Sequence, residues 1–159
     1  AYGTIEGHGY NIPVLRNDVI ISKRQLLEAR LFGASAVQLD ADFLSFEEYS
    51  ELLDYAHNIG LEVVVAIRNA EQLNYAQTAA DIVAVVNYNL DDFTADVQRS
   101  LQLVAQLPKD KVLLAEGGVR TADEIRKLKS AGYHGVLLGN CLMSQADPAA
   151  ALQQLRSEL

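Results

Sequence analysis

Short apolar runs alternate with longer segments of helical period along the chain, and this alternation limits the possible folds more than any other feature. The apolar runs occupy 13–16, 35–41, 61–67, 81–87, 111–116 and 134–139. They lack a regular exchange of polar and apolar residues, which is typical of strands buried on both faces. Because a helical segment follows each run, and the runs begin roughly 20 to 30 residues apart, the sequence predicts six strand–helix units around a parallel sheet.

Capping residues mark the ends of several predicted helices. Ser, Thr and Asp favour the N-cap because their side chains accept hydrogen bonds from the first turn, and glycine favours the C-terminal end because it adopts left-handed backbone. The candidate N-caps are Ser22, Ser45, Thr121 and Asp147, with Pro148 at a first helical position, and the candidate C-terminal glycines are Gly33, Gly60 and Gly132.

The length and the apolar content of the chain favour a single domain. The chain has 159 residues, of which 50% are hydrophobic, and this is enough for one substantial core. We expect that domain to cover 13–159. An irregular segment precedes it at 1–12, with three glycines and no clear period.

Charge and cysteine content narrow the classes of partner and compartment. The net charge of -8 argues against nucleic acid as a partner, because non-specific affinity for nucleic acid comes from Lys and Arg. No run of about 18 apolar residues occurs, so no membrane span is expected. The single Cys141 excludes an intramolecular disulfide and favours a reducing compartment, so we expect a cytoplasmic protein.

Six strand–helix units are compatible with a doubly wound open sheet or with a (βα) barrel that normally has eight units. In both architectures ligands bind at the carboxyl ends of the strands. The residues that follow each apolar run are therefore the candidate site residues. They are Asn17 and Asp18, Asp40 and Asp42, Arg68 and Asn69, Asn87 to Asn89, Glu116 to Gly118, and Gly139 to Cys141.

Glycine follows the last two apolar runs, in "LLAEGGV" and in "GVLLGN". Gly117, Gly118 and Gly139 allow backbone N–H groups to approach an oxyanion without a Cβ atom in the way, and the start of the following helix adds a favourable dipole. The pattern predicts a phosphate site at these turns. Glycine at a strand-to-helix turn could also serve only a tight connection, and the pattern alone leaves both interpretations open.

Longer motifs resemble one enzyme family. The chain contains "IPVLRNDVIISKRQLLEARLFGASAV", "GLEVVVAI", "NYNLDDF", "LLAEGGVRTADEIRKLKSAG" and "GVLLGNCLMSQADPAAAL". In order and spacing, roughly over residues 12–155, it resembles indole-3-glycerol phosphate synthase, the (βα)8-barrel lyase of tryptophan biosynthesis. The resemblance implies an incomplete TIM-type barrel whose units correspond to the third through eighth of that family. The first two strands are expected to have no counterpart, because about a dozen residues cannot form two strand–helix units.

The resemblance also assigns roles to residues. The family closes an indole ring with loss of carbon dioxide and water, using two lysines and a glutamate for proton transfer while backbone amides hold the phosphate. The resemblance leaves Glu116 as the candidate catalytic residue, in "EGG" where the family has "ESG". The resemblance implies no cofactor and no metal. The implied binding residues for substrate or phosphate are Gly117, Gly118, Gly139, Asn140, Asn87 and Asn89.

Other catalytic positions of the family are substituted. Asn17 occupies the lysine position of the "LRKDF" pattern, and Ala66 occupies the position of a glutamate. In the "INNRNL"-like segment, Val86 replaces the first Asn and Tyr88 replaces the Arg. Tyr88 is therefore expected to fill the mouth of the barrel, at the carboxyl ends of the strands, or to pack at an interface. An amide has no titratable proton and a methyl group is neither acid nor base. Each general acid or base contributes about 10² to 10⁴-fold, so these substitutions predict loss of the family reaction.

Asp40 and Asp42 point the same way at the end of the second apolar run, where the family is usually apolar. With Glu116 they could bind a divalent cation, or the two could act as an acid/base pair. Asp42 could instead only begin the turn before Ser45. We therefore expect no metal site from this pattern.

An incomplete barrel has two edge strands, here expected at 13–16 and 134–139, whose unpaired N–H and C=O groups invite pairing. We expect a second copy of the chain or another polypeptide to cover them, and the N-terminal dozen residues are an alternative cover for part of these edges. The main hypothesis is a catalytically degraded relative of the synthase that acts as a structural or interaction component and keeps a remnant phosphate site. Two alternatives remain open. One is a synthase that is active only with a separate N-terminal segment, and the other is a binding module for a phosphorylated metabolite.

Overall fold

Six parallel strands lie side by side in their order along the chain, within the residues 12–89 and 94–159 that the computed structural model describes. A doubly wound sheet reverses its strand order at one point, whereas consecutive order belongs to a barrel. The predicted (βα) barrel type is therefore confirmed. The strands are β1 (Leu15–Arg16), β2 (Ala36–Asp40), β3 (Glu62–Ile67), β4 (Ile82–Val86), β5 (Val112–Glu116) and β6 (Gly135–Leu137).

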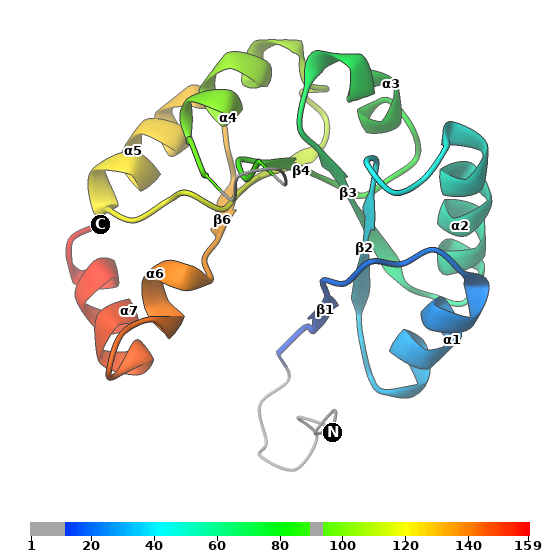
Figure 1. Cartoon of the computed structure of the whole chain (residues 1–159), viewed down its shortest axis with the longest axis horizontal. Helices are drawn as coiled ribbons and strands as arrows, with labels where there is room; N and C mark the ends of the chain where they lie inside the picture. The colour runs from blue at the N-terminus through cyan, green and yellow to red at the C-terminus, as the bar shows by residue number, and fades with distance from the viewer. Residues whose placement is uncertain (1–11, 90–93) are drawn as a thin grey trace.

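Helices follow the strands and lie on the outer side of the curled sheet (Figure 1). Within the described residues the ring of strands does not close, because β1 and β6 do not pair with each other. The fold is thus an incomplete (βα) barrel, as predicted; residues 1–11 of the predicted irregular segment lie outside the described residues. The helices are α1 (Lys23–Leu31), α2 (Phe46–Asn58), α3 (Leu73–Ala76), α4 (Gln98–Leu103), α5 (Ala122–Ala131), α6 (Asn140–Met143) and α7 (Pro148–Ser157), with 3-10 turns η2 (Ala70–Gln72) and η3 (Val104–Gln106).

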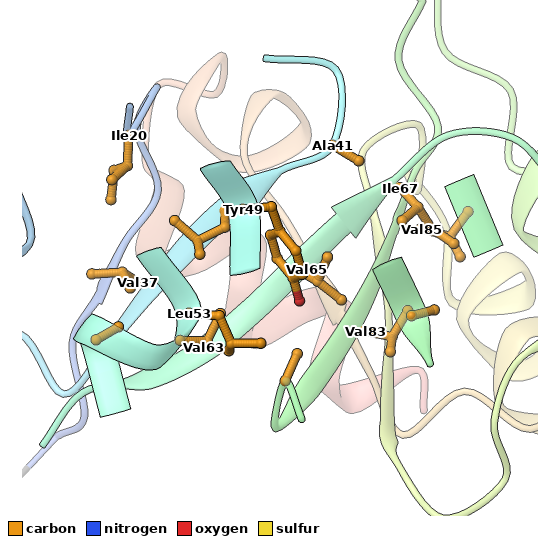
Figure 2. Close-up of a cluster of buried hydrophobic side chains, with 14 of the residues drawn as sticks. Ile20, Val37, Ala41, Tyr49, Leu53, Val63, Val65, Ile67, Val83 and Val85 are labelled. Carbon is orange, nitrogen blue, oxygen red and sulfur yellow. The ribbon is translucent and has the colours of Figure 1, made fainter. Parts of the chain in front are cut away.

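Both faces of the sheet are buried at its centre. On the outer face, Val65 of β3 belongs to the same buried cluster as Tyr49 of α2 (Figure 2). Successive residues of a strand point to opposite faces, so Val64, Ala66 and Ala84 face inward, and each of these is at most 1% exposed. Burial on both faces explains the continuous apolar runs in the sequence, and each large side chain buried in this way contributes about 1.5–3 kcal/mol.

The predicted helix caps are confirmed with one exception. Ser45 and Thr121 form capping boxes with Glu48 and Glu124, and Asp147 accepts from two backbone N–H groups of α7. The predicted C-terminal glycines all have positive φ, namely Gly33, Gly60 and Gly132. Ser22 stands at the N-cap of α1, but its side chain accepts no hydrogen bond from the helix backbone. Its hydroxyl donates to the side-chain oxygen of Gln25 instead.

The helix expected after the fourth strand begins later than the sequence pattern indicates. Tyr88 and Ala95 form an isolated antiparallel bridge, and the N–H of Asn89 donates to the carbonyl of Thr94 at 2.8 Å. These contacts pair Tyr88 and Asn89 with Ala95 and Thr94, and α4 starts only at Gln98, whose N–H donates to the carboxylate of Asp96. None of the helices in the described part of the chain has the length and apolarity that crossing a membrane requires.

Candidate binding site at the carboxyl ends of the strands

A cleft of about 280 Å³ lies at the carboxyl ends of β5 and β6. The four residues that the sequence predicts at the two glycine turns meet there. They line the cleft together with two residues from neighbouring segments: Gly117, Gly118, Gly139 and Asn140 with Tyr88 and Arg120.

Backbone N–H groups at this cleft are free to bind a ligand. Among the described residues, no protein acceptor is found for the N–H of Gly118, Gly139 or Asn140. The guanidinium of Arg120 likewise has no partner within that part of the chain, although its backbone N–H donates to Glu124. Uncommitted N–H donors beside an arginine form a setting that suits a phosphate oxygen.

Close packing explains the glycine at position 117. Its φ is +78°, which is left-handed backbone, and the ring of Tyr88 lies directly against it. A Cβ atom at Gly117 would stand 2.3 Å from Cε2 of Tyr88, far inside van der Waals contact. Tyr88 therefore fills the mouth of the partial barrel. This is one of the two roles that the sequence analysis allowed for it.

The two asparagines of the same segment are placed differently. Asn87 is 1% exposed; its amide donates to the carbonyl of Gly117 at 2.8 Å, and its oxygen accepts from the N–H and the hydroxyl of Ser100. Asn87 thus holds the glycine turn in position and does not line the cleft. Asn89 lines a neighbouring cavity, where it lies with Tyr88 and Arg99.

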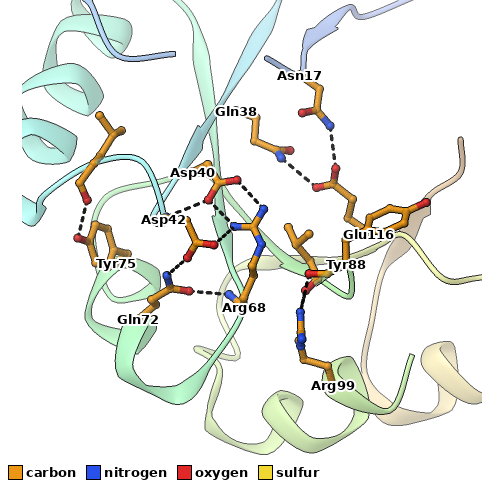
Figure 3. Close-up of polar contacts among 12 residues, drawn as sticks. Asn17, Gln38, Asp40, Asp42, Arg68, Gln72, Tyr75, Tyr88, Arg99 and Glu116 are labelled. Atoms are coloured by element: carbon orange, nitrogen blue, oxygen red, sulfur yellow. Dashed lines mark hydrogen bonds and ion pairs between the residues drawn. The ribbon is translucent and has the colours of Figure 1, made fainter. Parts of the chain in front are cut away.

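Glu116, the last residue of β5, is held by two amides across the concave side of the sheet. The side chain of Asn17, which follows β1, donates to Oε1 at 2.9 Å, and the side chain of Gln38 in β2 donates to Oε2 at 2.9 Å (Figure 3). These bonds connect strands that are not neighbours, so they bridge the interior of the partial barrel. Gln38 is 3% exposed, and its own oxygen has no partner among the described residues.

Asp40 and Asp42 both bind Arg68, which follows β3. Asp40 accepts two hydrogen bonds from the guanidinium at 2.5 and 2.8 Å, and Asp42 lies 3.0 Å from it (Figure 3). Burial lowers the pKa of Arg68, but the hydrogen bonds and charge of Asp40 and the charge of Asp42 outweigh it and raise the pKa above its ordinary value. The two acids therefore serve an ion cluster. No group of three His, Cys, Asp or Glu side chains in the described residues is arranged to hold a metal ion.

Three site residues were not recognised in the sequence. Gln38 could have been found, since it is the polar residue in the middle of an apolar run and shares the inward face with Asp40. Arg99 reaches back from α4 to donate to the carbonyls of Val86 and Tyr88, and no local pattern indicates this. Arg120 lines the cleft, two positions after Gly118.

The chemistry available at the mouth is binding through hydrogen bonds. Glu116 has amide neighbours, Arg68 is paired with two carboxylates, and no lysine is among the residues that line the cleft or the neighbouring cavity. An amide is not an acid at neutral pH. Among the described residues, the groups at this site are therefore suited to hydrogen bonding with polar or anionic groups.

Comparison with known proteins gives one family. Its profile, described as indole-3-glycerol phosphate synthase, matches residues 7–155. The indole-3-glycerol phosphate synthase of Bacteroides thetaiotaomicron is 39% identical over 143 residues, which are 90% of this chain and 55% of that protein. The enzyme of Campylobacter concisus is 39% identical over 145 residues, 91% of this chain and 56% of that protein. The chain thus spans about half the length of the curated relatives it matches.

A solved structure has a similar fold. It is described as a cube-shaped, highly porous protein cage designed by fusing symmetric oligomeric domains. Its TM-score is 0.64 at 21% identity, and the match covers 89% of this chain and 52% of that one. At this identity the likeness concerns the fold alone.

Proposed function

The chain belongs to the indole-3-glycerol phosphate synthase family, and from this premise we propose that it is a catalytically degraded member that binds a phosphorylated ligand without turning it over. The observation that carries the proposal is a contrast within one site. The glycine cleft that suits a phosphate is intact, whereas the groups that would move protons are replaced by an amide at Asn17 and a methyl group at Ala66.

The surroundings of these two positions support the proposal. Ala66 is fully buried and pairs with Asp40 of the neighbouring strand, so no solvent-filled space is left there for a mobile proton donor. Asn17 donates its amide hydrogen to Glu116, the candidate catalytic residue that is retained from the family. A carboxylate held by two amides has lost the cationic partners on which general acid–base catalysis in this family depends.

The alternative is a synthase that needs a separate N-terminal segment to be active. It is favoured by the retained Glu116 and by the relatives' names. Added strands could supply one lysine, but they cannot change Asn17 or Ala66. Each lost acid or base costs about 10² to 10⁴-fold, and such losses do not simply multiply, so we expect the completed protein to remain at least about 10²-fold below an intact relative.

Two measurements on the purified chain test the proposal. In calorimetric titration we expect saturable binding of inorganic phosphate. In an assay with the carboxyphenylamino-deoxyribulose phosphate of the family, we expect no indole-glycerol phosphate, with the Bacteroides enzyme as the active control. Turnover above background would refute the loss of catalysis, and a flat phosphate titration would refute the retained anion site.

We also propose an interaction role at the open edges of the sheet. β1 and β6 each pair on one side only in the described residues. Beside β1 there is a groove of about 440 Å³, lined by Val14, Ala29 and Phe32 among others. At the C-terminal end of α1, Leu31 is 80% exposed and the C-cap residue Phe32 is 52% exposed. Apolar surface next to an unpaired strand edge favours association with another protein surface.

Native mass spectrometry checks this role. We expect a mass above the 17.4 kDa of one chain, either as a multiple of it or as a complex with another polypeptide. Replacing Leu31 and Phe32 by lysine should then shift the distribution to the single chain, because a charge cannot be buried in an apolar interface without a large cost. A wild-type chain that stays monomeric at micromolar concentration contradicts the interaction role.

A further inference from the structure

The described sheet has the curvature of a closed barrel, although it is open between β1 and β6 (Figure 1). Asn17, which follows β1, and Glu116, which ends β5, are joined by a hydrogen bond of 2.9 Å across the concave side. In a flat sheet, four strand spacings would separate β1 from β5 by about 19 Å, which these two side chains cannot span. Strands four positions apart face each other in an eight-stranded ring. The six strands therefore leave a gap two strands wide between β1 and β6.

Both edges of this gap have backbone groups that point into it. The carbonyl of Val14 accepts a hydrogen bond of 3.1 Å from β2, so the N–H and C=O of the next residue, Leu15, point away from β2. At the other edge, the carbonyl of Leu137 accepts from the residue that follows β5, so the backbone groups of Val136 point away from β5. Each edge can therefore take one more parallel strand through the usual ladder hydrogen bonds.

The first and the last helix of the described chain both expose apolar side chains. Leu27 and Leu31 lie four residues apart on α1, hence on the same face, and they are 43% and 80% exposed. On α7, which follows β6, no residue is buried and Leu152 is 40% exposed. The groove beside β1 has Val14 and Leu15 in its lining. A strand alone would leave the helix faces in water, whereas a strand with a helix on its outer side can cover them.

A second copy of the chain does not fit this gap. It would bring six strands of the same curvature. Once one of its edge strands paired with β1 or β6, its further strands would collide with the opposite edge. A second copy can therefore pair with one edge at a time, whereas a segment of two strands pairs with both edges together.

Resting on the proposed interaction role, we propose that the partner of this chain is a separate polypeptide segment of two strand–helix units, which enters the gap with its strands parallel to β1 and β6. Its strands are continuous apolar runs, because both of their faces become buried. Each of its helices presents one apolar face, toward the groove beside β1 or toward α7. Because the segment pairs at both edges, it displaces a second copy that pairs at only one.

Native mass spectrometry with a defined probe tests this partner. The probe is the first two strand–helix units of the Bacteroides thetaiotaomicron enzyme, fused to a soluble carrier protein, and the carrier alone is the blank. We expect complexes of one chain with one probe, and the multiples that the chain forms by itself should disappear as the probe is added. Hydrogen exchange at the amides of Leu15 and Val136 should slow by at least about tenfold in the complex, because both amides become ladder donors.

Two lysine variants show whether the apolar face of α1 takes part. Leu27 on α1 and Val112 at the start of β5 are each 43% exposed. Leu27→Lys should weaken binding of the probe by at least about tenfold, since its charge would be buried in an apolar contact. Val112→Lys places the same charge away from the gap and should leave binding of the probe unchanged. Circular dichroism checks that both variants are folded.

The outcomes separate this inference from the proposed interaction role. If the chain forms multiples of itself but no complex with the probe, the interaction role stands and the partner of two strand–helix units is wrong. The inference is also overturned by complexes with two probes per chain, by unchanged exchange at Leu15 or Val136, or by a Leu27→Lys variant that binds like the wild type. A chain that stays monomeric with and without the probe refutes both proposals.

Discussion

Replacing Gly139 by leucine is expected to lower the affinity for inorganic phosphate by more than about tenfold while the fold keeps its stability. A Cβ atom at Gly139 would meet no heavy atom within 4 Å, and its φ of −125° lies outside the left-handed region. The new side chain therefore projects into the open space of the cleft without displacing protein. It covers N–H donors whose hydrogen bonds to an anion are worth about 1.5–3 kcal/mol each.

Two variants show whether the loss arises in the cleft. Ala149→Leu places the same leucine side chain at an exposed position of α7 and should change neither affinity nor stability. Gly117→Ala should lower stability by more than about 2 kcal/mol, because it combines left-handed φ with a clash against Tyr88. Calorimetry gives the affinities and urea denaturation the free energies of unfolding. If Gly139→Leu binds phosphate like the wild type, the anion does not bind at this turn.

The strands could be predicted from the sequence because each is a local apolar run that is buried in the fold. Continuous apolar runs identified all the strands of the described sheet, although β1 keeps only Leu15 and Arg16 of the predicted run. That strand pairs only with β2 in the described residues. The choice between a barrel and a doubly wound sheet depended on strand order, which periodicity does not contain; the family resemblance supplied it.

The site was predictable only in part, because its members differ in how local their signals are. The glycine turns could be recognised because strand end, glycine and helix start are contiguous in sequence. The partners of Glu116 could not, since Asn17 is 99 positions away along the chain and only the curvature of the sheet brings them together. Asp40 and Asp42 were recognised as a pair in the sequence, but nothing there linked them to Arg68. The positive charge of Arg68 explains why two carboxylates can lie together in a partly buried position.

Replacing Arg68 by methionine is expected to lower the free energy of unfolding by about 3–5 kcal/mol, the cost of removing one member of a buried ion cluster. The side chains of Arg68 and Asp40 are each 11% exposed, so water cannot take the place of the guanidinium. Asp40 and Asp42 are then left with unbalanced charge at the mouth of the partial barrel. Urea denaturation at pH 7 measures the loss.

Two comparisons identify the cause of that loss. The side chain of Arg24 is 87% exposed and pairs with Glu28 within α1. Replacing Arg24 by methionine should lower the free energy of unfolding by less than about 0.5 kcal/mol. The triple variant Arg68→Met, Asp40→Asn, Asp42→Asn should recover most of the lost stability. It removes the two unpaired carboxylate charges together with the guanidinium. If Arg68→Met is as stable as the wild type, the cluster does not hold the mouth together. The acids would then be free to act on a ligand, and the mouth would have to be assigned a different chemistry.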